Sequence, residues 1–419
     1  MTPPPQTAAL RRELGLPEAI GLGLGAMFGA GIFVVTGVAA GVAGPAFLVS
    51  LAIAGAAASC NGLSAAQLAA RYPQSGGTYE YGYRLLHPAA GFAAGWMFLA
   101  SKLAAAGTVA LGFGHYTASL LPAVPPVAAA AAAVIFATLA NVIGIQKTGR
   151  LNLLIVVFTL ASLACFIGFG AGSVRTANFL PWAPHGWRAV VEASALLFFA
   201  YTGYARLATL GEEVRDPETT IPKAIVASLW IALLVYLAVG AVAVGTAGAP
   251  ALAQTRAPLE RAAASFAFPG LNRVMVAGAA TAMLGVLLSQ VLGISRMMLA
   301  MSRRGDLPAF LAHVDPRRGL PLRAVGITGS IALLLAVTGR LESVLAAAAF
   351  TILIYYTLTN LAALRLPAHD RRYPPWVAWC GLLACLLMAG SLAPVTIASG
   401  LALLVAGFLF RFALKSNQV

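Results

Sequence analysis

The chain contains about a dozen apolar runs, each near the length that crosses a bilayer, separated by short stretches rich in proline, glycine and charge. A membrane-spanning helix needs about 20 mostly apolar residues. Hydrophobic residues make up 60% of the chain and charged residues only 10%, and a soluble fold of this size has too little interior to bury such a share. The sequence therefore predicts an all-α membrane protein in which the spans leave no room for a soluble domain.

Twelve spans are expected, at about 17–40, 44–70, 88–121, 125–146, 151–172, 189–210, 224–247, 273–300, 323–339, 342–364, 375–391 and 393–412. With the N-terminus inside, basic residues are about threefold more frequent in the loops assigned to the cytoplasm, as the positive-inside rule requires. The formal net charge of +14 thus reflects topology and not binding of nucleic acid. We expect a multi-pass protein of the cell inner membrane with both termini cytoplasmic.

Glycine is concentrated in the first span, which reads GLGLGAMFGAGIF between Gly21 and Phe33. Each glycine costs a helix about 1 kcal/mol relative to alanine. Such a cluster fits either close helix packing or an unwound stretch whose free backbone groups bind a ligand.

The sixth span has a similar interruption, Thr202-Gly203, set among the aromatics Phe198, Phe199, Tyr201 and Tyr204. Interrupted helices at corresponding positions of two halves are a pointer to a substrate site near the membrane midplane. The first span opens a half of five spans and the sixth opens a second such half, and because five is odd the two halves would lie in opposite orientations. This pattern favours the unwound alternative.

Four motifs in order carry a family resemblance: GAGIF (29–33), YPQSGGTYEYGYR (72–84), FFAYTGYARLATLGEEVRDPETTIPKAI (198–225) and ISRMMLAMSRRGDLP (294–308). Together they resemble the amino acid–polyamine–organocation (APC) superfamily. The resemblance implies a LeuT-type fold in one domain over residues 1–419. It would hold two inverted five-helix repeats (about 17–172 and 189–364) and two C-terminal helices (about 375–412).

The two breaks suit the two ends of an amino acid. A helix N-terminus carries partial positive charge and favours an anion, so a substrate carboxylate fits the amides of Gly29, Ala30, Gly31 and Ile32. The end of a half-helix suits an ammonium group, here at the carbonyls of Phe199, Ala200 and Tyr201 beside Thr202 and Gly203. The resemblance places the substrate backbone at these same breaks. Replacing Gly31 with leucine is expected to abolish binding while leaving the protein folded.

Lys102 lies in the third span, and an ionisable side chain at membrane depth is by default a functional candidate. It would suit proton coupling or control of access, and the alternative is a snorkelling or structurally paired lysine. Ser101 and Ala105 share the helix face expected to look toward the substrate.

Some sodium-independent members of the family carry a lysine in the fifth span, where this chain has Thr159. Lys102 could supply that charge from another helix. Alternatively, Thr159, Ser289 and Ser295 could offer oxygens to a sodium ion, although helical hydroxyls more often bond a carbonyl one turn back.

Arg206 follows the break in the sixth span, where many relatives have an acidic residue. It could bind a carboxylate through two hydrogen bonds, or pair with Glu212 or Glu213 as a structural lock. Those glutamates could also form a cytoplasmic gate with Arg71 or Arg84, since alternating access supplies the two states that such a gate needs.

The sequence therefore predicts a secondary transporter of neutral amino acids, proton-coupled or exchanging, with lipid as its other partner. The charge at Lys102 and Arg206 disfavours a cationic substrate, but a cationic amino acid or polyamine antiporter remains the alternative. A substrate-gated channel or sensor is the competing class. No nucleophile–base pair, phosphate loop or metal cluster appears, so an enzyme, a metal site and a cofactor are not expected.

Overall fold

The computed structural model describes residues 14–72, 76–205, 207, 214–266, 268, 270–338 and 341–416, with backbone alone for 145–152 and 341. The described residues are almost entirely helical, and their only β-type pairings are two isolated bridges, one of which joins Leu14 to Val214. The prediction of an all-α protein is confirmed.

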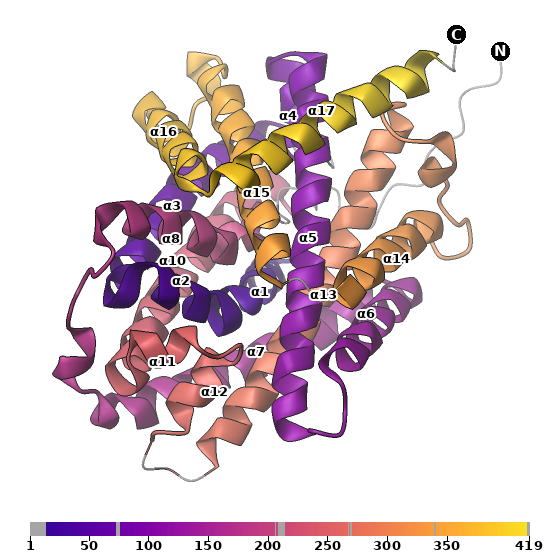
Figure 1. Cartoon of the computed structure of the whole chain (residues 1–419). Coiled ribbons are helices and arrows are strands. Elements are labelled where there is room, and N and C mark those ends of the chain that lie inside the picture. The colour runs from indigo at the N-terminus through magenta and orange to yellow at the C-terminus, as the bar shows by residue number, and fades with distance from the viewer. Residues whose placement is uncertain are drawn as a thin grey trace, which may run out of the picture.

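Every expected span coincides with helix in the described residues (Figure 1). The first span is α1 (Leu16–Met27), the π-helical stretch η1 (Gly31–Val35) and α2 (Thr36–Ala43), and the sixth is α8 (Gly186–Tyr201) with the 3₁₀ turn η5 (Thr202–Tyr204). The others are α3 (Phe47–Arg71), α5 (Pro88–Leu120), α6 (Pro126–Ile143), α7 (Ile145–Gly170), α10 (Pro217–Ala247), α13 (Leu271–Arg303), α14 (Leu322–Thr338), α15 (Leu341–Leu364), α16 (Pro375–Ser391) and α17 (Pro394–Ser416).

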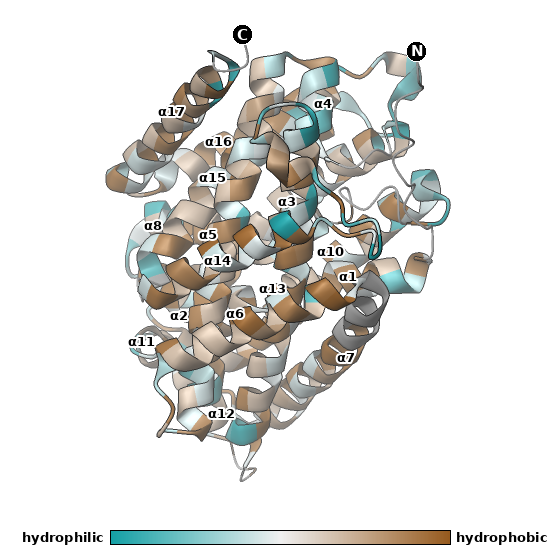
Figure 2. Ribbon diagram, turned by 90° about the vertical axis from the view of Figure 1, so that its right-hand side faces the viewer, coloured by the Kyte–Doolittle hydropathy of each residue, from teal (hydrophilic) through white to brown (hydrophobic). Residues whose placement is uncertain are grey.

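Among the described residues, eight helical stretches are long and apolar enough to cross a membrane, and the first of them, Leu16–Arg71, takes in α1 to α3 together. The helices α14 and α16 are apolar but shorter. Figure 2 shows hydrophobic residues along the bodies of the helices, with hydrophilic residues gathered at the end that holds both termini. The chain is a multi-pass membrane protein, while the count of twelve spans and the division into two inverted repeats stay predictions.

Three short helices lie at the two ends of the bundle. The helix α4 (Thr78–Leu85) is at the end with the termini, whereas α11 (Ala249–Ala253) and α12 (Pro258–Ala263) are at the opposite end (Figure 1). Proline occupies the first turn of α12, where its fixed φ suits a helix start and its missing N–H is no loss.

The two interrupted helices touch one another at their breaks. A Cβ on Gly31 would lie 2.4 Å from the Ala200 Cβ and 2.5 Å from its Cα. At Gly203, a Cβ would lie 2.6 Å from the Ala26 carbonyl carbon. These glycines are needed because backbone meets backbone here. The expectation that Gly31→Leu leaves the protein folded is therefore wrong, since even alanine has no room.

Candidate functional site

The first span is interrupted where the sequence predicts. The helix α1 ends at Met27, and Phe28 then turns to an extended conformation with ψ 95°. In the part of the chain that the structure describes, the amides of Gly29, Ala30 and Gly31 donate to no backbone acceptor. The amide of Ile32, the fourth predicted donor, is already bonded to the Gly29 carbonyl at 3.2 Å.

All three unpaired amides belong to buried residues. More than 90% of buried backbone N–H groups in proteins have a partner, so three successive exceptions among described residues are unusual. They stand at the start of η1 and α2, where aligned peptide dipoles add partial positive charge. Unpaired N–H groups at the start of a helix are donors of the kind that favours an anion such as a carboxylate.

The second break differs because its carbonyls already have partners. The Thr202 hydroxyl donates to the Phe199 carbonyl at 2.9 Å, and the Tyr236 hydroxyl donates to the Ala200 carbonyl at 3.1 Å. The same tyrosine lies 2.7 Å from the Met27 carbonyl, so one side chain of α10 spans both interrupted helices. A carbonyl has two lone pairs, and a ligand ammonium could still share these oxygens.

Lys102 binds directly at this second break. Its ammonium donates to the Thr202 carbonyl and to the Thr202 hydroxyl, both at 3.1 Å, and the residue is only 5% exposed. The ring of Phe98, one turn earlier on α5, lies 5.9 Å from the same nitrogen. The lysine therefore does not snorkel to the membrane surface: it joins α5 to the end of α8.

The other predicted site residues of the membrane core are buried or already hydrogen-bonded to helix carbonyls. The Ser101 hydroxyl donates to the Ala348 carbonyl of α15 at 3.0 Å, so it faces that helix, and Ala105 is fully buried. The hydroxyls of Thr159 and Ser295 donate to Ile155 and Leu292 of their own helices. Neither hydroxyl is free as a donor, although its lone pairs could still meet a cation.

Arg206, Glu212 and Glu213 lie outside the described residues, and their roles stay predictions. Their expected gate partners have other contacts. Arg71 pairs with Asp370 at 2.9 Å, and Arg84 pairs with Glu80 at 2.5 Å.

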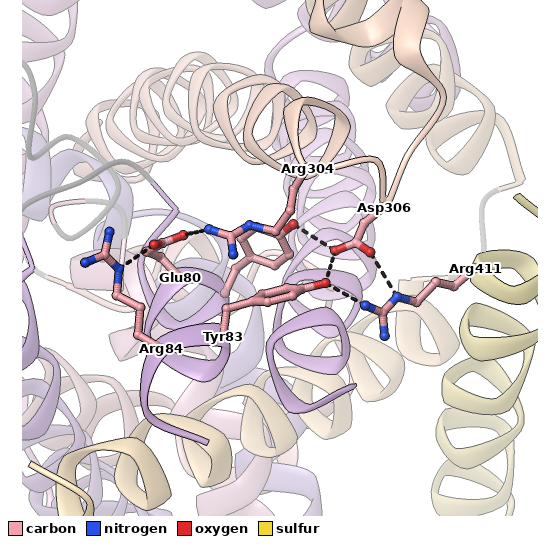
Figure 3. A network of polar contacts seen from close by, with 7 residues as sticks. Glu80, Tyr83, Arg84, Arg304, Asp306 and Arg411 are labelled. Carbon is pink, nitrogen blue, oxygen red and sulfur yellow. Dashed lines mark hydrogen bonds and ion pairs between the residues drawn. The ribbon is translucent and has the colours of Figure 1, made fainter. Parts of the chain in front are cut away.

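Sequence reasoning missed a polar cluster at the end of the molecule that holds the termini (Figure 3). We call it the Asp306 cluster; its members are Tyr79, Glu80, Tyr83, Arg84, Arg304, Asp306 and Arg411. Asp306 is fully buried and accepts from the Tyr79 hydroxyl at 2.8 Å, the Tyr83 hydroxyl at 2.5 Å and the Arg411 Nε at 2.9 Å.

A second carboxylate, Glu80, lies between Arg84 and Arg304 in the same cluster. The guanidinium of Arg304 also stacks over the Tyr83 ring, 4.3 Å from its centroid. Burial first, and then the Asp306 carboxylate, raise the pKa of Tyr79 well above its ordinary value. Its hydroxyl therefore stays protonated and donates. The cluster fastens α4 to the end of α13 and to α17.

Two of the resemblance motifs, YEYGYR and RRGD, supply most of this cluster. The i, i+4 spacing of Tyr79 with Tyr83 and of Glu80 with Arg84 places each pair on neighbouring turns of a helix. That spacing was the available signal. The contacts of Arg411 with Asp306 and with Tyr83, which lie 105 and 328 residues away, carry no local signal.

Comparison with known proteins agrees with this arrangement. The family model for amino acid permeases matches residues 19–417. An uncharacterized transporter of Mycobacterium tuberculosis is 41% identical over 401 residues, covering 95% of this chain and 90% of the relative. A branched-chain amino acid permease of Bacillus subtilis is 29% identical, covering 96% and 93%. A chloroplastic cationic amino acid transporter of Arabidopsis thaliana is 29% identical, covering 75% and 61%.

The family match extends over almost the whole chain and includes both interrupted helices, the short helix α4 and the end of α13. It also agrees with the all-helical, multi-pass architecture. The chain belongs to the amino acid permease family of the APC superfamily, and is a membrane transporter.

Proposed function

We propose that the protein is a secondary active transporter of neutral amino acids that works by alternating access, as a proton-coupled porter or an exchanger. The observation that carries this proposal is the set of buried, unpaired amides at Gly29, Ala30 and Gly31. They offer donors to a carboxylate without any charged side chain. A zwitterion therefore binds here without a formal countercharge beside its carboxylate.

Charge at the breaks supports a neutral substrate. Among the described residues whose side chains hydrogen-bond to the two breaks, Lys102 is the one basic or acidic residue, and its ammonium is a cation. An ammonium or guanidinium on the substrate side chain would be repelled and would find no carboxylate among those contacts. The buried side chains of Ala30, Ala200 and Phe199 that flank the breaks are all apolar, which suits an apolar substrate side chain.

Lys102 supports a coupling role. Its ammonium contacts the carbonyl and hydroxyl oxygens that a monovalent cation would seek, so the protein supplies its own cation at this break. Loss of the proton would weaken both bonds to Thr202 and loosen α5 from α8. Transport coupled to protons, or exchange without ions, follows more naturally than dependence on sodium.

Counterflow in proteoliposomes tests the proposal. Vesicles are preloaded with unlabelled alanine, leucine and methionine, and a labelled panel is offered outside in sodium-free buffer. We expect labelled neutral amino acids to accumulate transiently, which a channel or sensor cannot do. Accumulation of arginine or putrescine instead would establish the cationic alternative, which the Arabidopsis relative's name favours. Silence across the panel would contradict the proposal.

Topology belongs to the same proposal. Figure 1 marks both termini at one end of the bundle, the end at which the short helix α4 lies. The excess of basic residues there favours the cytoplasm for this end, in the inner membrane of a cell. The ends of α5 and α13 that flank α12 would then face outward.

A further inference from the structure

An open pocket lies at the end of the molecule opposite both termini, away from the helix breaks. Its volume is about 420 Å³, within the range of about 300–1,000 Å³ common for small-molecule sites. The end of α5, the short helix α12 and the first turns of α13 form its walls. The lining residues are Ser119, Leu120, Glu260, Asn272, Arg273 and Val276.

The pocket is lined by one acidic and one basic side chain that do not form an ion pair with each other. Glu260 and Arg273 form no ion pair together, and neither side chain has a hydrogen-bond or ion-pair partner among the described residues. Partial burial raises the pKa of Glu260 above its ordinary value, and the neighbouring Arg261 opposes that shift. A carboxylate and a guanidinium that face one cavity unpaired suit a ligand that carries both charges.

The geometry of α13 adds to the anionic half of such a site. Asn272 and Arg273 belong to the first turn of this helix of 33 residues, which begins after Gly270. Most N–H groups of its first turn already donate to the Gly270 or Phe268 carbonyl, so it is the helix dipole that favours negative charge here. The ammonium of the ligand would instead meet the carboxylate of Glu260, which belongs to the separate helix α12.

We propose that this pocket is a loading site for a zwitterionic amino acid, with the ligand carboxylate on Arg273 and its ammonium on Glu260. The inference rests on the proposed transport function. Along α5, Ser119 and Lys102 are about 26 Å apart at the rise of an α-helix, so the pocket is distinct from the breaks. It would concentrate substrate at the outer face before entry.

A thiol reporter tests occupancy without requiring transport. Ser119 lines the pocket, and its hydroxyl bonds only within its own helix, to the His115 carbonyl, so Ser119→Cys should fold. The full-length variant is placed in proteoliposomes and labelled with a membrane-impermeant methanethiosulfonate, with the unsubstituted protein as background. We expect millimolar L-leucine to slow labelling at least fivefold. Leucinamide and 4-methylpentanoate, each with one of the two charges, should protect far less.

Charge variants in the same background locate the ligand. Glu260→Gln and Arg273→Gln should each abolish most of the protection by leucine, because a charge-assisted hydrogen bond contributes about 1.5–3 kcal/mol, or roughly 10- to 100-fold in affinity. Arg261→Gln is the matched control, because it removes a charge from the same short helix but does not line the pocket. Equal losses in all three variants, or none in the first two, would overturn the assignment.

Counterflow on the same vesicles separates this inference from the function on which it rests. Intact leucine counterflow without protection of the introduced thiol overturns the loading site alone. Protection without counterflow of any amino acid leaves the pocket standing and overturns the transport function. Protection together with counterflow, both sensitive to Glu260→Gln, supports the two claims at once.

Discussion

The two helix breaks and the Asp306 cluster use opposite chemistry. At the breaks, the polar groups are backbone N–H and C=O groups and one ammonium, and the described contacts include no carboxylate. Glycine there lies within van der Waals distance of alanine. In the Asp306 cluster, two carboxylates meet three arginines and two tyrosines (Figure 3). The breaks, where we propose that a zwitterion binds and is released, offer backbone donors and a single ammonium, whereas the cluster fastens helices together through ion pairs.

The same contrast explains the effect expected of substitutions. At the breaks, a small change of shape should destroy binding because backbone positions are fixed by contact. In the cluster, a change of charge should reduce stability because a buried ion without its partner is costly.

The largest expected effect is steric, at Gly31. Gly31→Ala should abolish transport, at least 100-fold, because its Cβ would lie within 2.5 Å of Ala200. The double variant with Ala200→Gly should recover only part, since the Ala200 Cα remains in the way. Counterflow measures transport by the single and the double variant, and size-exclusion profiles show whether each is folded. Gly168→Ala in α7 is the control, because nothing lies within 4 Å of its Cβ. Normal transport by the Gly31→Ala protein would show that the close contact with Ala200 is not required.

Asp306→Asn should cause the largest loss of stability. Breaking a buried ion pair costs about 3–5 kcal/mol, and Arg411, 13% exposed, would lose its carboxylate. Thermal unfolding in detergent measures the effect. The exposed pair offers a matched control: Arg71 is 54% exposed, so Arg71→Gln should cost at most about 1 kcal/mol. Similar shifts in both variants would show that burial does not set the strength of these pairs.

Lys102→Met should come next, because it keeps the length of the side chain but removes the ammonium that binds Thr202. We expect transport to fall about tenfold, which corresponds to about 1.4 kcal/mol, and to lose its dependence on pH between 5 and 9, while KM changes little. Initial rates of leucine uptake across that range are the measurement. A variant with the same pH profile as the parent protein would make Lys102 structural.

Thr202→Val should have the smallest effect. It removes one of the two oxygens that Lys102 contacts but leaves the carbonyl in place, so we expect a change of about threefold, in line with one neutral hydrogen bond of about 0.5–1.5 kcal/mol. Uptake kinetics of Thr202→Val, of Lys102→Met and of the variant with both changes complete a double-mutant cycle. Additive losses would mean that the two residues act separately.

Much of the architecture was predictable because bilayer physics leaves few choices. Apolar runs must be helices, since an unpaired backbone cannot face lipid, and each expected span coincides with helix where the structure describes it. The glycine cluster and Thr202-Gly203 marked both breaks, because glycine is a weak helix former.

The side-chain partners were less predictable because they depend on contacts far apart in sequence. Lys102 and Thr202 are 100 residues apart, and Asp306 and Arg411 are 105 apart. No periodicity relates them. Ser101 was assigned to the substrate face by helical spacing, yet its hydroxyl bonds to Ala348, because a one-residue turn of 100° separates it from Lys102.

We propose that the amides of Gly29, Ala30 and Gly31 bind the carboxylate of a transported amino acid. The direct measurement is competition for labelled leucine counterflow by leucinamide, which has the same side chain and ammonium but no carboxylate. We predict that unlabelled leucine competes and that leucinamide fails at a 100-fold higher concentration, as expected for the loss of about 2.7 kcal/mol. Competition by leucinamide as strong as that by leucine would contradict the account.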